Sequence, residues 1–308
     1  MKKLSIIVSL ITDKNAYQKD QATAAKEAAL RLGADVRVVF ADSDAVTQSE
    51  QLLKAIQSPE GIRPDGIVCL PVGTTLERVA REAATRGIAW ALVNREGDYL
   101  MELRNVHKTL AFMITVDQEE IGRIQGRQFG VLLPSGGTVL YILGPSTNPV
   151  FKLRLAGMQS TKPANTQIIT MRGNLTEESG YQAISSWLRL HTSRTTRVDL
   201  VAGQNDDMAI GARRAFEDAL SGDERERWSS LPYTGCDASS GAGAEWIRRG
   251  LLTASVFLPP TAGLALETLV KSIQGKTQPP LQQQIAPVSR PLLEKLAEVA
   301  GKKEAVPK

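Results

Sequence analysis

Apolar and polar positions alternate in blocks along this chain, and the blocks predict strands and helices in turn. Continuous apolar runs are typical of buried strands, and they lie at residues 4–11, 36–41, 66–70, 88–93, 111–116, 138–143, 167–171, 198–202 and 253–257, with further strands near Tyr233 and Ile285. Apolar residues at helical spacing predict helices at 18–32, 45–57, 74–86, 117–133, 150–161, 177–190, 206–220, 241–249, 261–274 and 291–300. This order predicts an α/β fold with parallel sheets covered on both faces.

Two sheets of about five strands fit the pattern better than one sheet of roughly ten. The length of 308 residues agrees, because domains average roughly 150 residues. Asp117 and Glu120 predict a capping box at the start of one helix, whereas the polar residues 97–108 predict an irregular connection.

Composition excludes several function classes. Apolar residues at 42% and charged residues at 23% are ordinary for a globular protein, and 37 basic against 33 acidic residues give too small a surplus for a nucleic-acid surface. The isolated Cys69 and Cys236 and only two histidines argue against a zinc cluster, and whether the two cysteines form a disulfide stays open. We expect no metal and no cofactor.

Enzyme signatures are missing from the sequence. No G-x-S-x-G, P-loop or G-x-G-x-x-G motif follows a predicted strand, and neither histidine lies near a strand end that the pattern places firmly. The sequence therefore predicts a protein without catalytic activity.

The first residues leave the compartment open. Lys2 and Lys3 precede an apolar run of about eight residues that meets Asp13 without a small-x-small cleavage site, which favours a strand over a secretory signal. No apolar run reaches the length of a membrane span. Either the chain stays in the cytoplasm or a leader was removed, and two unpaired cysteines favour the first.

Polar side chains follow most predicted strands, which is where ligands bind in open parallel sheets. The amides, carboxylates and guanidinium groups at these strand ends, with one aromatic ring, suit a neutral polyhydroxylated ligand better than a phosphate: Asp13, Asn15, Tyr17, Gln18, Asn94, Arg95, Glu96, Ser146, Asn148, Lys152, Arg154, Arg172, Asn174, Thr176, Gln204, Asn205, Asp206, Asp207, Cys236 and Asp237.

These residues also have purely structural interpretations. Asn205, Asp206 and Asp237 could cap the helices that follow them. Others could be solvated or packed on their own helix: Tyr17, Arg95 and Arg154. Their joint occurrence at strand ends is what favours a ligand site.

Several of these segments carry a family resemblance. Residues 204–211 read Gln-Asn-Asp-Asp-Met-Ala-Ile-Gly, and shorter matches are Asp-Lys-Asn-Ala-Tyr at 13–17, Pro-Asp-Gly-Ile-Val at 64–68, Val-Asn-Arg at 93–95 and Gly-Cys-Asp at 235–237. Over nearly its whole length the chain resembles sugar-binding periplasmic proteins of the ribose-binding type, whose Q-N-D-x-M-A-x-G segment the first stretch matches. The same fold serves as the effector domain of lactose-repressor-like regulators.

The resemblance implies two similar three-layer α/β/α lobes with mostly parallel sheets, joined by a three-crossing hinge, as in type I periplasmic binding proteins. We expect residues 1–116 with 259–287 in the N-terminal lobe and residues 117–258 with 288–308 in the C-terminal lobe. The hinge crossings are expected near residues 115–118, 257–260 and 286–289.

The resemblance also assigns ligand-binding positions in the first lobe. Asn15 and Tyr17 match the asparagine and the first aromatic that line the sugar site, and Gln18 falls where a second aromatic is usual. Asn94 and Arg95 match an Asp-Arg pair, with asparagine in place of aspartate.

Positions in the second lobe follow in the same way. Arg154 matches a ligand-contacting arginine, and Leu175 stands where an aromatic often stacks. Asn205 and Asp237 match residues that bond hydroxyls, and Leu258 falls where a glutamine is common. The departures remove one carboxylate and most of the stacking, so we expect a sugar other than ribose, a polyol or another polar ligand.

The function that this resemblance implies is that of a monomeric solute-binding protein. It would capture a small sugar-like ligand in the cleft between its lobes and close by hinge motion, for delivery to an ABC transporter permease or a sensor kinase, and the resemblance places it in the periplasm. The alternative is the effector-binding domain of a lactose-repressor-like regulator without its DNA-binding headpiece. A DNA-binding headpiece needs about 60 residues ahead of the first strand. The first predicted strand begins at Leu4, so the sequence favours the solute-binding protein over this alternative.

Overall fold

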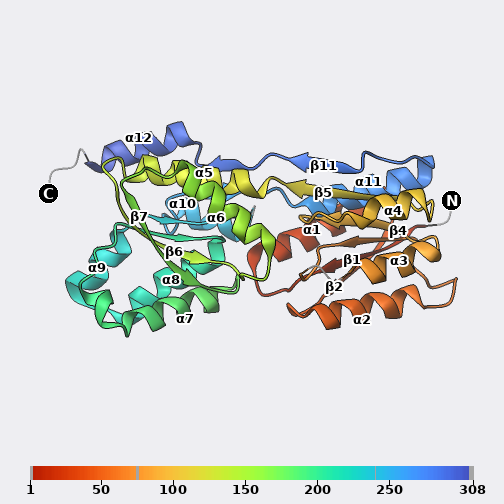
Figure 1. The fold of residues 1–308 in the computed structure, drawn as a ribbon, viewed down its shortest axis with the longest axis horizontal. Coiled ribbons are helices and arrows are strands. Elements are labelled where there is room, and N and C mark those ends of the chain that lie inside the picture. The colour runs from red at the N-terminus through yellow and green to blue at the C-terminus, as the bar shows by residue number, and fades with distance from the viewer. Residues whose placement is uncertain (1–2, 74–75, 240, 305–308) are drawn as a thin grey trace. The chain divides into compact units, whose positions relative to one another are not determined.

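The computed structural model describes residues 3–73, 76–239 and 241–304. Contacts divide the chain into two compact units: unit 1 is Met1–Val116 with Pro260–Ile285, and unit 2 is Asp117–Pro259 with Ala286–Lys308. The chain passes between the units three times, after Val116, Pro259 and Ile285. Figure 1 shows the elements in chain order.

Unit 1 is built on a six-stranded sheet in which every neighbouring pair is parallel. The strand order is β11-β5-β4-β3-β1-β2. Their bounds are β1 Ser5–Leu10, β2 Asp35–Phe40, β3 Gly66–Cys69, β4 Ala89–Val93, β5 Ala111–Val116 and β11 Gln282–Ile285. In register, Ile6 of β1 pairs with Val36 of β2 and with Gly66 of β3.

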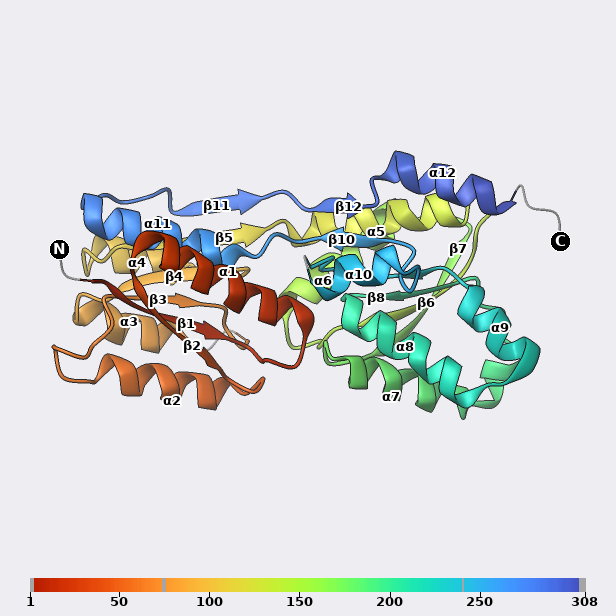
Figure 2. The ribbon, with the colours of Figure 1, turned by 180° about the vertical axis from the view of Figure 1, so that it is seen from behind.

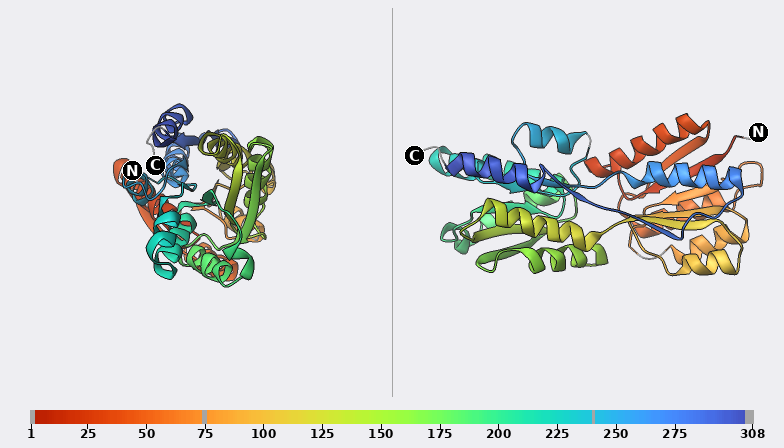
Figure 3. Two further views of the ribbon diagram at one scale, coloured as in Figure 1. Left: turned by 90° about the vertical axis from the view of Figure 1, so that its left-hand side faces the viewer. Right: turned by 90° about the horizontal axis from the view of Figure 1, so that it is seen from above.

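Helices cover both faces of this sheet because successive side chains of a strand point to opposite faces. Ile6, Val8 and Leu10 pack in one core with α1 (Ala16–Leu32) and α11 (Thr261–Gly275), which lie side by side although they are far apart in sequence (Figures 2 and 3). Ile7 and Trp90 pack in the opposite core with three helices: α2 (Ala45–Ile56), α3 (Glu77–Thr85) and α4 (Tyr99–Asn105).

Unit 2 contains a four-stranded parallel sheet of order β7-β6-β8-β9. The bounds are β6 Gly137–Leu143, β7 Thr166–Arg172, β8 Leu200–Gly203 and β9 Tyr233–Thr234. An antiparallel pair, β10 (Ser255–Phe257) and β12 (Val288–Arg290), continues it through single parallel bridges from Thr234 to Ala254 and from Asp237 to Phe257.

The second sheet is also covered on both faces. Val139 and Tyr141 pack with α5 (Gln118–Leu132) and α6 (Pro149–Thr161). Leu140 and Ile142 pack with α7 (Glu177–Leu188), α8 (Asp206–Ala219) and α9 (Gly222–Ser230). The remaining helices are a 3₁₀ turn at His191–Arg194, α10 at Ala242–Arg248 and α12 at Leu293–Glu304. The predicted α/β class with parallel sheets is confirmed.

The sequence pattern was wrong in several segments. The stretch 97–108 contains α4, whose Leu100 and Leu103 are buried; two leucines in seven residues give too little periodicity to stand out. Helix α9 was missed because Trp228 is its only buried residue, and β12 was missed because three residues show no pattern. The helix expected at 74–86 begins at Glu77, and residues 74 and 75 lie outside the described part of the chain.

Helix starts follow local chemistry in part. The Asp117 side chain accepts a hydrogen bond from the Glu120 N–H at 2.8 Å and so caps α5. Asp237 does not cap α10, whose first turn follows Gly241 without a side-chain cap. Among the described helices, none has the length and apolar character needed to cross a membrane.

Glycines let α5 and α6 approach closely. A Cβ atom on Gly122 would lie 2.0 Å from the carbonyl oxygen of Arg154, and one on Gly157 would lie 2.0 Å from that of Glu119. Backbone cannot move aside as the end of a flexible side chain can, so this contact tolerates no larger residue. It holds the start of α5 against the part of α6 that carries Arg154.

We therefore expect Gly122→Ala to lower the free energy of unfolding by about 3 kcal/mol or more, because overpacking forces the two helices apart. Gly130→Ala on the same helix is the matched control: its Cβ would meet only the Pro163 ring, with Cγ at 3.4 Å and Cδ at 3.8 Å. The control should leave stability unchanged or raise it by up to about 1 kcal/mol, since alanine favours a helix. Urea unfolding of both variants tests this, and equal stabilities would refute the close-packing argument.

Candidate ligand-binding site

The loop after β1 is fixed by two of the predicted site residues. Asn15 caps α1, its Oδ1 accepting a hydrogen bond from the Gln18 N–H at 2.9 Å. The Gln18 side chain reaches back, and its Oε1 accepts one from the Ile11 N–H at 3.1 Å. Both side chains are buried, so the loop at the carboxyl end of β1 has a defined shape.

Tyr17 and Asn94 meet in a buried polar chain at the same edge of the sheet. Asn94 Nδ2 donates to the Tyr17 hydroxyl at 2.7 Å, and Asn94 Oδ1 accepts from Thr261 Oγ1 at 3.2 Å. Gln21 Nε2 donates to Thr261 Oγ1 at 3.4 Å, and Gln21 Oε1 accepts from the Ala262 N–H at 2.7 Å. Gln21 thereby supplies a hydrogen-bond acceptor to the first turn of α11, which has no side-chain cap of its own.

Asn94 has a backbone φ of 55°, a left-handed conformation that asparagine tolerates better than most residues. Its neighbour Arg95 is half-buried, and Arg95 Nη1 donates to the Asn94 carbonyl at 2.7 Å. The structure thus brings together all five residues predicted for the first lobe: Asn15, Tyr17, Gln18, Asn94 and Arg95.

In unit 2, Arg154 is only 6% exposed, so its interpretation as a solvated charge is wrong. Its Nε donates to Gln118 Oε1 at 2.9 Å, and its Nη1 donates to the Gln204 carbonyl at 2.7 Å. The guanidinium carbon lies 5.4 Å from the centre of the Phe151 ring. No described residue takes a hydrogen bond from Nη2, so two N–H donors of a rigidly held cation are uncommitted.

Asn205 acts both as a helix cap and as a link between strand ends. Its Oδ1 accepts from the Met208 N–H at 3.0 Å at the start of α8, which confirms the capping interpretation. Its Nδ2 donates to the Leu175 carbonyl at 2.9 Å, and Leu175 has a φ of 63°. The loop after β7 is therefore held against the loop after β8.

Asp237 and Leu258 are paired through their backbones. The Asp237 N–H donates to the Val256 carbonyl at 2.9 Å, and the Leu258 N–H donates to the Asp237 carbonyl at 3.1 Å. Leu258 is only 2% exposed.

Asp206 follows Asn205 in the chain and bonds the residue after Asp237, so it links the loops that carry these two side chains. Its Oδ2 accepts from the Ala238 N–H at 2.7 Å, and its Oδ1 accepts from Ser255 Oγ at 2.6 Å. Burial raises the pKa of this carboxyl to about 6, against the hydrogen bonds from Ser255 and Ala238 that favour its charged form.

Sequence reasoning missed several residues that organise the site. Three of them are Gln21, Gln118 and Ser255, which lie inside or at the start of helices and strands. No local sequence pattern marks them, because their hydrogen-bond partners are distant in sequence. Gln204 and Asp206, by contrast, were among the strand-end candidates, although the family resemblance assigned neither of them to the ligand site.

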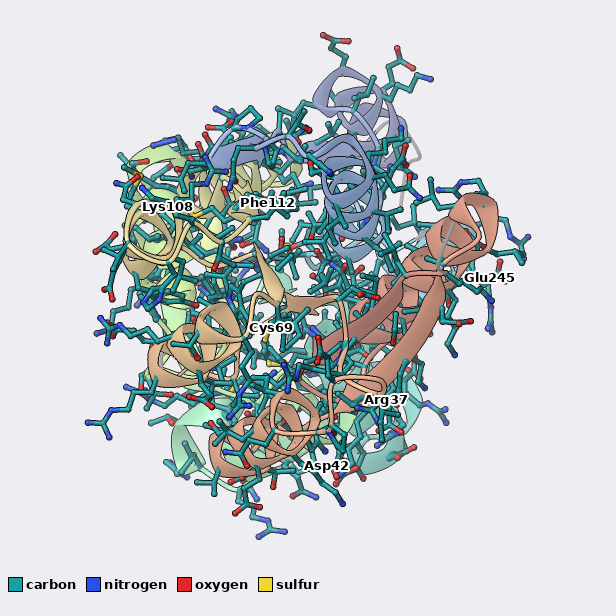
Figure 4. The ribbon with its side chains drawn as sticks, turned by 90° about the vertical axis from the view of Figure 1, so that its right-hand side faces the viewer. Arg37, Asp42, Cys69, Lys108, Phe112 and Glu245 are labelled. Atoms are coloured by element: carbon teal, nitrogen blue, oxygen red, sulfur yellow. The ribbon has the colours of Figure 1, made fainter. Side chains whose placement is uncertain are left out.

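The described residues hold no cluster of three or more histidine, cysteine or acidic side chains that could bind a metal ion. Cys69 and Cys236 are free thiols, and burial raises the pKa of each. Figure 4 shows Cys69 in the interior of unit 1, among the side chains of its core. The polar groups available are amides, hydroxyls, carboxylates and guanidinium groups, which recognise ligands through hydrogen bonds.

The family model described as "Periplasmic binding protein domain" matches residues 6–277. The chain belongs to this family. Its members are binding proteins, and the predicted family resemblance is confirmed.

Individual relatives agree with that assignment. The D-xylose-binding periplasmic protein of Escherichia coli K12 is 27% identical over 276 residues, which cover 84% of this chain and 74% of that protein. An ABC transporter periplasmic solute-binding protein from Actinobacillus succinogenes, solved with bound D-allose, has a TM-score of 0.79 at 18% identity and covers 96% of this chain and 100% of its own.

A fructose-binding periplasmic domain of a hybrid two-component system has a TM-score of 0.75 at 22% identity, covering 98% of this chain and 95% of that domain. These structures share the fold of this chain, that of type I periplasmic binding proteins, and the predicted fold class is confirmed.

The Asp206 carboxyl should make stability depend on pH. Its pKa is raised from 3.8 to about 6 on folding, so the folded protein binds a proton more tightly than the unfolded chain. Its contribution to stability is fully present below about pH 4 and is lost, by roughly 3 kcal/mol, as the pH rises through about 6.

Urea unfolding at several pH values between about 4 and 7, on the wild type and on Asp206→Asn, measures this contribution. We expect the difference in stability between the two to shift in favour of the variant as the pH rises. Parallel curves for the two proteins would show that Asp206 does not titrate in this range.

Proposed function

We propose that this protein is a solute-binding protein that captures a small sugar or polyol with side chains from both of its units and passes it to an ABC transporter or a sensor. The observation that carries the proposal is that hydrogen bonds hold polar residues at the carboxyl ends of parallel strands in each unit. Tyr17 bonds Asn94 in unit 1, while Asn205 bonds the Leu175 carbonyl and Asp206 the Ala238 N–H in unit 2. In open parallel sheets this edge is where ligands bind. Membership of the family and the sugars named for its relatives support the ligand class.

The ligand-binding residues that we propose are those predicted from the sequence, and each group of them contributes differently to binding. Arg154 offers two N–H donors of Nη2 to a ligand oxygen, while Asn205 and Asp237 supply amide and carboxylate groups. Tyr17 and Asn94 offer a hydroxyl and an amide that already bond each other, so they present one preorganised surface. Leu258 has no polar side-chain group, so it would contribute shape alone.

The ligand that fits this set is neutral and rich in hydroxyl groups. Asn94 stands where the family resemblance implies an aspartate, so the site carries one negative charge fewer, and Gln18 and Leu175 replace aromatic rings. Hydrogen bonds rather than stacking would then supply most of the recognition. We infer that the protein binds its ligand without catalysis, as a monomer, and that it does not bind nucleic acid. The same ligand-bound state could be recognised either by a transporter or by a sensor.

A panel of D-xylose, D-allose, D-fructose, D-ribose and myo-inositol tests the ligand class by thermal shift and calorimetry. A ligand at about 100 times its Kd stabilises the folded protein by about 2.7 kcal/mol, so a binder will raise the melting temperature measurably. We expect at least one sugar other than ribose to do so, and no effect from the whole panel would overturn the proposal.

Arg154→Lys should weaken that binding by at least tenfold, because a lysine cannot present two fixed donors while bonding Gln118 and the Gln204 carbonyl. The matched control is Arg78→Lys at an exposed position of α3, which should leave the affinity unchanged. Calorimetry with the best sugar of the panel measures both, and equal affinities for the two variants would remove Arg154 from the site.

Closure is the second expected consequence of binding. A ligand held by both units stabilises the conformations in which both contact it, in proportion to its differential affinity. Small-angle scattering should therefore show a smaller radius of gyration with saturating ligand than without, and an unchanged value with a bound sugar would contradict closure.

A further inference from the structure

The turn that carries Asp237 has an unusual backbone. Asp237 has a φ of 120° and Ala238 a φ of 39°, so two successive residues with side chains lie in the left-handed half of conformational space. Such a conformation is strained for a residue with a side chain and persists only where its surroundings impose it. Something in unit 2 must hold this turn.

Asp206 contacts the turn on both sides of Asp237. Its backbone N–H donates to the Cys236 carbonyl at 2.7 Å, and its Oδ2 accepts from the Ala238 N–H at 2.7 Å. The other carboxylate oxygen is fixed by Ser255 Oγ at 2.6 Å. Ser255 is anchored in turn, because its carbonyl accepts from Gln128 Nε2 at 2.9 Å.

The surroundings leave room for a carboxylate at this place. A Cβ atom on Gly235 would lie 2.1 Å from Asp206 Oδ1, and one on Gly243 would lie 2.9 Å from Oδ2. Both glycines are therefore needed for the carboxylate to reach the turn. The clamp consists of one buried carboxylate, two glycines that admit it and one serine that orients it.

We propose that Asp206 is a positioning residue, which fixes the strained turn of Cys236 to Ala238 and so sets the direction of the Asp237 side chain toward ligand. The inference rests on the proposed function, since it assigns Asp206 a role in the affinity of that site. Asp206 touches no ligand itself: both of its oxygens bond protein groups. Asp206 acts on Asp237 through the backbone of the turn, which it bonds at Cys236 and at Ala238.

Three variants separate positioning from simple stabilisation. Asp206→Ala removes both side-chain bonds to the clamp, whereas Asp206→Asn can keep them, its oxygen accepting from Ala238 and its amide donating to Ser255. Asp206→Ala combined with Ala238→Gly relieves part of the strain, because glycine adopts a φ of this sign freely. Asp218→Ala, at an exposed position of the same helix, is the matched control.

Affinity for the best binder among D-xylose, D-allose, D-fructose and myo-inositol is the first readout. We expect Asp206→Ala to lose at least tenfold, Asp206→Asn to stay within about threefold of the wild type, and the double variant to regain stability without regaining affinity. If stability and affinity return together in the double variant, or if folded Asp206→Ala binds as the wild type does, the positioning role is refuted.

Hydrogen exchange of the Ala238 amide in the ligand-free protein is the second readout, and it needs no ligand. We expect exchange at least tenfold faster in Asp206→Ala and unchanged in Asp206→Asn and Asp218→Ala. Fast exchange in Asp206→Ala with no sugar bound by any form would uphold the clamp on the turn and refute the proposed function. Unchanged exchange in Asp206→Ala would refute the clamp whatever the sugars do.

Discussion

The backbone groups at the ends of the parallel strands need hydrogen-bond partners once the sheets are buried, and buried glutamines supply many of them. A buried donor or acceptor without a partner costs about 1–3 kcal/mol, so each such group constrains the chain around it. Gln48 bonds the Leu70 carbonyl and the Val72 N–H, and Gln204 bonds the Phe151 carbonyl and the Gly144 N–H. Gln48 of α2 thus fixes the loop after β3, and Gln204 in the loop after β8 fixes the first residue after β6 and the first turn of α6.

The same constraint shapes the candidate site. Gln125 Nε2 donates to the carbonyls of Gly203 and Gly235, the last residue of β8 and the first after β9. The loops that carry Asn205 and Asp237 are therefore tied together beneath the polar surface. The side chains that we propose for ligand contact stand on this framework, and their positions depend on residues that we do not place in contact with ligand. The hydrogen bonds that hold the candidate-site residues in each unit follow from the rule that buried polar groups need hydrogen-bond partners.

Much of the fold could be predicted from the sequence, because continuous apolar strands and periodic helices are local signals. The strand at 111–116 was placed with its observed bounds, and α1 was expected to end before Gly33, which adopts the left-handed conformation of a helix end at φ 66°. Where an element buries few side chains, as in α4 and α9, the local signal was too weak and tertiary packing decided. The candidate site stays a prediction from residues that follow strands, of which Tyr17, Gln18 and Arg154 lie in the helices after those strands.

The sequence by itself therefore determined the α/β class, the covered parallel sheets and the family, through periodicity and the segment at residues 204–211. Only the tertiary structure decided which polar groups bond one another. Gln21 meets Ala262 across 241 positions of the chain, and Asp206 meets Ala238 across 32. No local pattern encodes such partners, because hydrogen bonds between distant residues form only after the sheets have brought their carboxyl ends together.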